Sequence, residues 1–229
     1  MVTLAGLCCG LSSIRSAMAD RWETAVWFIL AAAIIDALDG SIARMLKATS
    51  SFGAQLDSLS DFVCFGVAPA LVIYIWQLHH IKGFGWAIVL FFAVCCVLRL
   101  ARFNTNLSDT QQAEWQKRFF TGIPAPMGAL LALTPLIATL YFDPALLPNL
   151  KLLNAACMLV VAILMASRIP TLSFKGAKIR HDLVLPVMLL FGGTVVAFIS
   201  EPWPTVLALL GVYAAGIPFG ALRYYQLAR

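Results

Sequence analysis

The chain has 229 residues, of which 61% are hydrophobic and only 12% are charged, and its mean hydropathy is +0.88. An average soluble domain is roughly 25% charged, so this composition excludes a soluble globular protein and indicates an integral membrane protein. The formal net charge of +5 would suit a basic face that meets anionic lipid head groups.

Apolar runs close to the roughly 20 residues that a helix needs to cross a bilayer recur along the whole sequence. Helix is the expected state because the backbone polar groups of a span must be satisfied within it. The predicted fold is an all-α polytopic bundle of about eight transmembrane helices in a single membrane domain, residues 1–229. In chain order the expected spans are 2–19, 23–46, 53–78, 84–104, 125–142, 150–168, 183–199 and 204–223.

The first expected span also lies where a signal peptide would lie. A signal peptide begins with a basic region and continues into a short apolar core. Here Met1 is followed by no basic region, and Ser12, Ser13 and Arg15 interrupt the far end of the apolar run. We therefore expect residues 1–18 to be the first helix of the bundle.

Basic residues are distributed unevenly between the two sides of the predicted bundle. Cytoplasmic loops carry the excess of Lys and Arg, so the richer side should be cytoplasmic, with both termini and a polar site. This side has Arg44, Lys47, Arg99, Arg102, Lys117, Arg118, Arg168, Lys175, Lys178, Arg180, Arg223 and Arg229, against Arg15, Arg21, Lys82 and Lys151 on the other. Topology explains most of these residues, and we expect no nucleic acid among the partners.

Four aspartates lie in the second and third expected spans. Asp36 and Asp39 are three residues apart, and Asp57 and Asp61 are four apart, so each pair lies on one face of a helix. Carboxylates are costly at membrane depth, and those present there usually have a function. Two such helices side by side would gather four carboxylates, whose repulsion requires a neutralising cation. The sequence therefore predicts a divalent metal site.

Small and basic residues accompany these acids. Arg44 follows Asp39 by five positions, with Lys47 and Ser50 close behind. A divalent metal bridges phosphate oxygens and arginine binds phosphate in bidentate fashion, so the segment suits a pyrophosphate. Small residues let a ligand or a helix approach the backbone; here they are Gly40, Ala43 and Gly53. An ion pair of Asp36 or Asp39 with Arg44 alone would not account for four acids.

The fixed positions of this region resemble the complete signature of the CDP-alcohol phosphotransferases. The pattern reads Asp36-x2-Asp39-Gly40-x2-Ala43-Arg44-x8-Gly53-x3-Asp57-x3-Asp61. The resemblance implies a membrane enzyme that transfers a phosphatidyl group from CDP-diacylglycerol, or a phosphobase from a CDP-alcohol, onto an alcohol with release of CMP. It implies a divalent metal cofactor, two ions of Mg²⁺ or Mn²⁺.

The same resemblance implies roles for individual residues. Metal ligands would be Asp36, Asp39, Asp57 and Asp61, and Asp61 would also be the catalytic base. Nucleotide or pyrophosphate contacts would come from Thr3, Gly40, Ala43, Arg44, Ser50 and Gly53. The chemistry agrees, because an alcohol needs a carboxylate to take its proton and phosphoryl oxygens need positive charge. Asp61 would have to be the least tightly coordinated of the four acids, since a metal-bound carboxylate is a weak base.

Motifs outside the signature concern the acceptor alcohol. The stretches 99–104, 120–126 and 167–175, with Thr3 to Gly10 at the start, resemble the phosphatidylserine synthases of this family. With the signature at 36–61, the resemblance covers a catalytic core over 1–180 and leaves 183–223 as additional helices. The family usually has a Pro-Asn pair before the threonine that matches Thr3, and this sequence contains none there.

Serine as acceptor carries a carboxylate and an ammonium, so its pocket needs a cation and a hydrogen-bond acceptor. Arg102, Asn104 and Arg168 are the candidates for acceptor binding, and the expectation for Arg99 is an anchor that reaches the membrane interface. The resemblance further implies CDP-diacylglycerol, serine and membrane lipids as partners, a homodimer, and the inner membrane of a bacterial cell.

Two alternatives remain open at this level. The first is the same chemistry with another acceptor, such as glycerol phosphate, inositol or choline. The second is a divalent-cation transporter, in which intramembrane acids line a path. A transporter predicts acids that continue toward the far side, whereas the four aspartates cluster near one face and spans four to eight contain no carboxylate.

Overall fold

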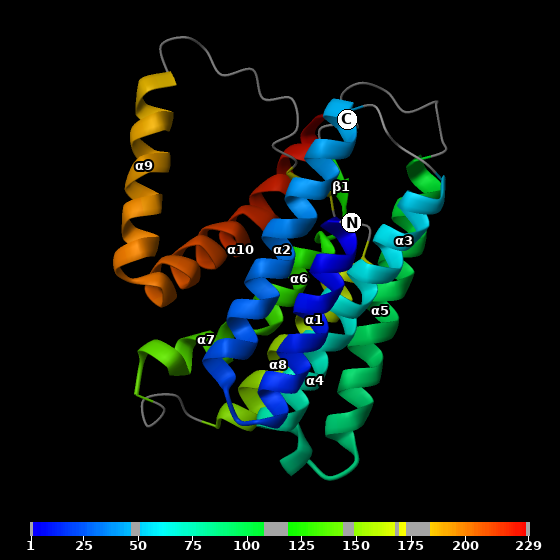
Figure 1. Ribbon diagram of the computed structural model, residues 1–229, viewed down its shortest axis with the longest axis vertical. Helices are drawn as coiled ribbons and strands as arrows, with labels where there is room; N and C mark the ends of the chain where they lie inside the picture. Colours follow the sequence, from blue (N-terminus) through cyan, green and yellow to red (C-terminus); the bar gives the residue numbers. More distant parts are fainter. Residues whose placement is uncertain are drawn as a thin grey trace.

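The computed structural model describes residues 2–46, 51–107, 119–143, 149–167, 170–172 and 184–227. These residues form a bundle of helices, with one small pair of strands (Figure 1). The elements are α1 Val2–Met18, α2 Trp22–Leu46, α3 Ser51–Asp61, η1 Phe62–Val67, α4 Ala68–Trp76, η2 Leu78–His80, α5 Phe84–Leu107, β1 Phe119–Thr121, α6 Ala125–Ala132, α7 Thr134–Tyr141, α8 Leu150–Ala166, β2 Pro170–Leu172, α9 Val184–Ser200 and α10 Pro202–Leu227.

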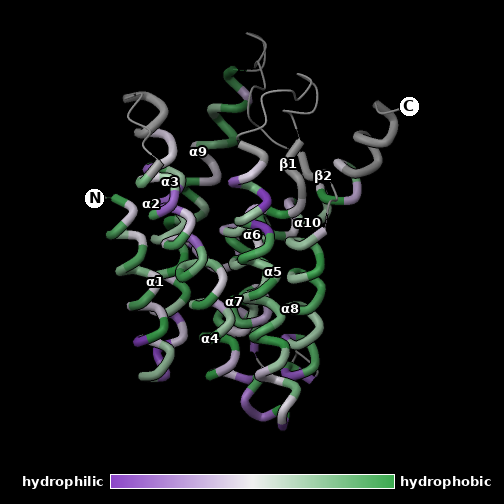
Figure 2. The backbone as a smooth tube through the Cα atoms, turned by 90° about the vertical axis from the view of Figure 1, so that its right-hand side faces the viewer, coloured by the Kyte–Doolittle hydropathy of each residue, from purple (hydrophilic) through white to green (hydrophobic). Residues whose placement is uncertain are grey.

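Most helices coincide with the apolar segments that the sequence predicts to span a membrane, but the expected span 125–142 divides at Leu133 into the short helices α6 and α7. Four described stretches are long and apolar enough to cross one: 22–41, 52–76, 84–105 and 202–220. The helices α1, α8 and α9 are apolar but shorter. Figure 2 shows apolar residues along most of the tube, with polar residues near the labels of α2 and α3 and in the loops at the lower end. The helical membrane character is confirmed, and the count of eight crossings stays a prediction.

One departure from the all-helical prediction is a two-stranded antiparallel sheet. Phe119 pairs with Leu172, Phe120 with Thr171 and Thr121 with Pro170. The strands lie between expected spans, where aromatic and β-branched residues favour extended backbone. Gly122, at φ 77°, ends the first strand, and a Cβ there would lie 2.8 Å from the Met165 carbonyl oxygen. Glycine is therefore required where the chain turns against the end of α8.

The third expected span is not one regular α-helix. A π-helical segment, η1, follows directly after Asp61, and the Ala68 N–H donates to the carbonyl of Val63, five residues back. Pro69 comes next, in the first turn of α4. Proline has no N–H, and its ring crowds the carbonyl four residues before it, so a wider turn at this point is expected. Such π segments are frequent at functional sites.

Small residues bring α1 close to the segment that carries Asp57 and Asp61. A Cβ on Gly10 would lie 2.8 Å from Cys64 Sγ and 3.0 Å from Cys64 Cα. The Cys64 thiol donates to the Gly6 carbonyl at 3.2 Å, and the Ser60 hydroxyl donates to the Thr3 carbonyl at 3.2 Å. These contacts recur once per turn, as in membrane helices whose backbones approach closely. They fix the height of Thr3 against α3.

The core lies between α2, α4, α5, α6, α7 and α8. Its largest fully buried side chains include Phe65, Phe92, Ile137, Met158 and Met165. The two C-terminal helices, α9 and α10, join this core at one end. The ring centroid of Trp27 of α2 lies 5.0 Å from that of Trp203 of α10, in a tilted contact, and 5.8 Å from that of Phe198 of α9, in an edge-to-face contact. Beyond that end α9 stands apart from the other helices (Figure 1) and has no buried residue.

Candidate metal centre

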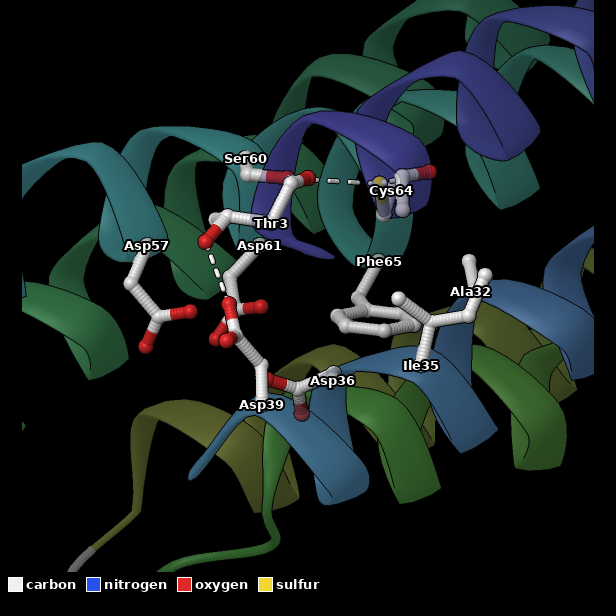
Figure 3. A pocket seen from close by; sticks show the side chains of 11 residues that line it. Thr3, Ala32, Ile35, Asp36, Asp39, Asp57, Ser60, Asp61, Cys64 and Phe65 are labelled. Carbon is white, nitrogen blue, oxygen red and sulfur yellow. Dashed lines mark hydrogen bonds between the residues drawn. The ribbon is translucent and has the colours of Figure 1, made fainter. Parts of the chain in front are cut away.

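Three of the four aspartates form a compact cluster. Asp36 comes from α2, and Asp57 and Asp61 come from α3. Each is half-buried, and one carboxylate oxygen of each lies within 4.8 Å of the others. The helices that carry the two pairs therefore meet side by side, as the sequence predicts. Figure 3 shows the carboxyl groups gathered at one side of the pocket, with Phe65, Ile35 and Ala32 at the other.

The fourth acid, Asp39, has its own partner. The Thr3 hydroxyl donates a hydrogen bond to Asp39 Oδ2 (Figure 3). Asp39 also lines the pocket and interacts electrostatically with Asp36 and Asp57. The first helix thus contributes directly to the site, through a residue that the family resemblance links to the nucleotide.

The donor set fits a hard divalent cation. Carboxylate oxygens are the ligands that Mg²⁺ and Mn²⁺ favour, and the pocket that the four acids help to line has a volume of about 10 Å³. That volume corresponds to about one water-sized sphere, which suits an ion and is far too small for a nucleotide. The cluster can therefore hold metal.

Arg99 of α5 also belongs to the site. Its charge interacts with those of Asp61 and Asp36, and its Nε is buried without a hydrogen-bond partner among the described residues. The sequence predicts an interfacial anchor, whereas the structure places this charge close enough to Asp61 and Asp36 to interact with theirs. The signal available in the sequence was that Arg99 falls inside an expected span, where an ionisable residue is a functional candidate by default.

The candidate acceptor residues have partners within the protein. Arg102 Nη1 donates to the Ala166 carbonyl, which ties α5 to the end of α8. Asn104 Nδ2 donates to the Ser58 hydroxyl at 2.9 Å, next to Asp57 on α3. Both side chains are exposed, and the sequence could not foretell either contact.

Several predicted residues are placed only in part. Gly40 follows Asp39 on α2, and Gly53 lies on α3 one turn before Asp57. The backbones of Ala43 and Arg44 continue α2, but their side chains lie outside the described part. Outside it altogether are Ser50 and Arg168.

Other residues at the site were not singled out from the sequence. The pocket lining includes Gly6, Ser60, Cys64 and Phe65, which look like ordinary packing residues in an apolar segment. Tyr213 of α10 interacts electrostatically with Arg99. The last helix therefore reaches the neighbourhood of Arg99, which the sequence did not predict.

Comparison with known proteins identifies a family for this arrangement. A model of the CDP-alcohol phosphatidyltransferase family matches residues 1–168, which contain all four aspartates. Several relatives carry the name CDP-diacylglycerol–serine O-phosphatidyltransferase, including the following three. The Mycobacterium leprae protein (strain TN) is 36% identical over 220 residues, 95% of this chain and 72% of the relative. The Mycobacterium tuberculosis H37Rv protein is 34% identical over 228 residues, 100% and 79% respectively. The Helicobacter pylori 26695 protein is 32% identical over 227 residues, 98% and 89%.

Proposed function

The chain belongs to the CDP-alcohol phosphatidyltransferase family, and we propose that it transfers the phosphatidyl group of CDP-diacylglycerol to L-serine, giving phosphatidylserine and CMP. The observation that carries the proposal is the cluster of Asp36, Asp57 and Asp61, whose carboxylate oxygens lie within 4.8 Å of one another. It is supported by relatives named CDP-diacylglycerol–serine O-phosphatidyltransferase, which align with this chain over most of their own length. The protein is a membrane enzyme of phospholipid synthesis.

The reaction breaks the phosphoanhydride bond of CDP-diacylglycerol and forms a phosphate ester bond to serine. The serine hydroxyl oxygen forms a bond to the lipid-bearing phosphorus, and the bond from that phosphorus to the CMP oxygen breaks. Asp61 accepts the hydroxyl proton, because an alcohol is a poor nucleophile until a nearby carboxylate takes its proton. Direct displacement and a covalent phosphatidyl intermediate are both compatible with these residues.

The four acids, Asp36, Asp39, Asp57 and Asp61, would hold two divalent cations, Mg²⁺ or Mn²⁺. Such cations neutralise the charge that develops on the phosphoryl oxygens and on departing CMP. The hydrogen bond from Thr3 supports this assignment for Asp39, since it fixes the direction of that carboxylate. The Asp61 side chain is half-buried, and its charge interacts with that of Arg99. Partial burial suits a base that is shielded from water.

We assign the nucleotide to the open side of the acids. Its contacts would come from Thr3, Gly40, Ala43, Arg44, Ser50 and Gly53. Of these, Thr3 lines the pocket, and Gly40 and Gly53 lie on α2 and α3, the helices of the acids. Acceptor contacts would come from Arg102, Asn104 and Arg168. The hydrogen bond from Asn104 to Ser58, the residue that follows Asp57, supports a place for Asn104 near the rim of the pocket.

The proposal includes an arrangement in the membrane. Eight spans would place both termini and the polar site in the cytoplasm, in the inner membrane of a bacterial cell. Figure 1 supports this, because the start of α1 and the ends of α2 and α5 lie at the same end of the bundle. The single domain would cover 1–229, with the catalytic core at 1–180 and additional helices at 183–223, and the enzyme would work as a homodimer among membrane lipids.

An acceptor screen tests this function. The purified protein in lipid nanodiscs, with CDP-diacylglycerol and Mg²⁺ or Mn²⁺, should release CMP when L-serine is added. Glycerol phosphate, inositol and choline are the competing acceptors. CMP release with one of these and not with serine would replace serine as the acceptor and leave the family chemistry in place.

A second assay addresses the cation transporter. Proteoliposomes loaded with a fluorescent metal indicator should show no Mn²⁺ influx above that of protein-free vesicles. Influx that does not depend on CDP-diacylglycerol, with no CMP release for any alcohol, would favour transport over transfer.

A further inference from the structure

Arg99 is a partly buried cation near the metal cluster, and one of its donor atoms has no partner among the described residues. Its Nε is buried and lacks a hydrogen-bond partner among the residues described. Its Cζ lies 5.7 Å from the centroid of the Phe103 ring, close enough for a cation–π contact. A guanidinium has five donors, and a buried donor left unpaired is unfavourable. Phe103 covers the group without satisfying Nε, which remains available for an acceptor atom.

The depth of Arg99 is fixed by contacts between α5 and the helix of the acids. At the outer end, Asn104 bonds to Ser58. At the inner end, a Cβ built on Gly66 would lie 3.1 Å from Cys96 Sγ. Between these contacts the two segments run antiparallel. At a rise of about 1.5 Å per residue, Arg99 lies about 7.5 Å inward of Asn104 and Asp61 about 4.5 Å inward of Ser58, a difference that one side chain spans.

The electrostatic surroundings of Arg99 agree with that position. Its charge interacts with Asp61 and Asp36, and these two acids are members of the metal cluster. Carboxylates that ligate metal have few lone pairs left to satisfy a guanidinium. Arg102, one turn outward, differs in this respect because it already donates to the Ala166 carbonyl. Among the arginines described on α5, Arg99 is thus the one available to a ligand near Asp61.

Serine has a matching shape. Its hydroxyl and carboxylate are separated by three covalent bonds of about 1.5 Å, so the two groups lie within about 4 Å of each other. If Asp61 accepts the hydroxyl proton, the carboxylate must lie in the immediate neighbourhood of Asp61. An anion there needs a cation, and Arg99 is a cation whose charge interacts with that of Asp61.

We propose that Arg99 binds the carboxylate of the acceptor serine and so selects an amino-acid alcohol over alcohols that lack a carboxylate. The inference rests on the proposed function and deepens it, since it names the residue that recognises the acceptor. An oxygen of the lipid-linked phosphate is the other anion that could reach a guanidinium here, and the experiment separates the two sources.

The experiment compares L-serine with L-serinamide, which keeps the hydroxyl and the ammonium but replaces the carboxylate with a neutral amide. CMP release is measured for the wild type, Arg99→Gln and Arg99→Lys. We expect the ratio of kcat/KM for serine to that for serinamide to fall on the order of 10- to 100-fold in Arg99→Gln, through a higher KM for serine. Arg99→Lys should be intermediate, because an ammonium is not a bidentate fork.

The ratio is measured within one protein, so partial loss of folded enzyme cancels. The KM for CDP-diacylglycerol should stay within about twofold of the wild type. The control variant Arg15→Gln makes the same change in the last turn of α1, at the opposite end of that helix from Thr3. It should leave the ratio unaltered.

Three results would overturn the inference. The first is a ratio that Arg99→Gln leaves unchanged. The second is a raised KM for CDP-diacylglycerol with that ratio unchanged, which would assign Arg99 to the phosphate. The third is a ratio of kcat/KM for serine to that for serinamide that falls in Arg102→Gln but not in Arg99→Gln. In each case the wild type still uses serine and the proposed function stands. A wild type that does not use serine at all would remove both.

Discussion

The side-chain amide of Asn104 donates a 2.9 Å hydrogen bond to the hydroxyl of Ser58, and this contact joins α5 to the helix of Asp57 and Asp61. Because membrane helices gain little from apolar burial against one another, interhelical polar contacts help to set their register. The pair therefore aligns the acidic helix with the helix that carries Arg99.

A double-mutant cycle tests this alignment. Asn104→Ala and Ser58→Ala should each lower kcat/KM, and the double variant should lose less than the sum, with a coupling energy of about 0.5 to 1.5 kcal/mol. Unfolding midpoints and kinetics of the four proteins provide the measurement. Strict additivity would show that the bond does not contribute.

Replacement of the proposed base should stop turnover without loss of the fold. General-base catalysis contributes about 10² to 10⁴-fold, so Asp61→Asn should lower kcat by at least about 100-fold. Helical circular dichroism and the thermal midpoint should stay close to those of the wild type. Asp20→Asn, the same change at an exposed turn with φ 57°, is the matched control. Wild-type turnover in Asp61→Asn would remove the base assignment.

Metal removal should affect both activity and stability. A chelator should abolish CMP release, and Mg²⁺ or Mn²⁺ should restore it. A ligand at about 100 times its Kd stabilises the folded state by about 2.7 kcal/mol, so metal should raise the unfolding midpoint. Asp57→Asn should reduce that rise, because Asp57 offers one of the three clustered oxygens. The same rise in the variant would mean that metal binds elsewhere.

Thr3→Val should weaken catalysis through Asp39. The variant keeps the size of the side chain and removes the hydroxyl that donates to Asp39. A hydrogen bond to a charged group is worth about 1.5 to 3 kcal/mol, and partial solvent exposure lessens this, so we expect kcat/KM to fall about tenfold. Thr3→Ser should retain most activity. Thr194→Val, which removes a hydroxyl bonded only within α9, should behave like the wild type.

Gly10→Ala should displace α1. Its new Cβ would lie 3.0 Å from the backbone Cα of Cys64, and overpacking of this kind costs typically about 1 to 3 kcal/mol. The shift would also move Thr3 away from Asp39. The control is Gly192→Ala on α9, where a Cβ has nothing within 4 Å and helix propensity favours alanine. Equal unfolding midpoints for the two variants would argue against close packing at Gly10.

Much of the fold followed from hydropathy, because a segment that crosses a bilayer must be apolar and must satisfy its own backbone. The helix positions were therefore predictable. The π segment after Asp61 and the pairing of β1 with β2 were not, since both depend on how a local irregularity fits its neighbours. Pro69 indicates a break in the regular helix, but the π segment in the turn before it depends on how this segment packs against its neighbours.

The sequence by itself determined the chemistry of the site, because carboxylates at helical spacing in an apolar segment need a cation wherever they lie in the bundle. Which residues share that site was decided by the tertiary structure. Thr3 meets Asp39 because Gly6 and Gly10 admit α1, and the charge of Arg99 lies near Asp61 on a helix whose register the bond of Asn104 to Ser58 helps to set. These contacts join helices far apart in the chain, and their distances depend on packing that spacing along one helix cannot encode.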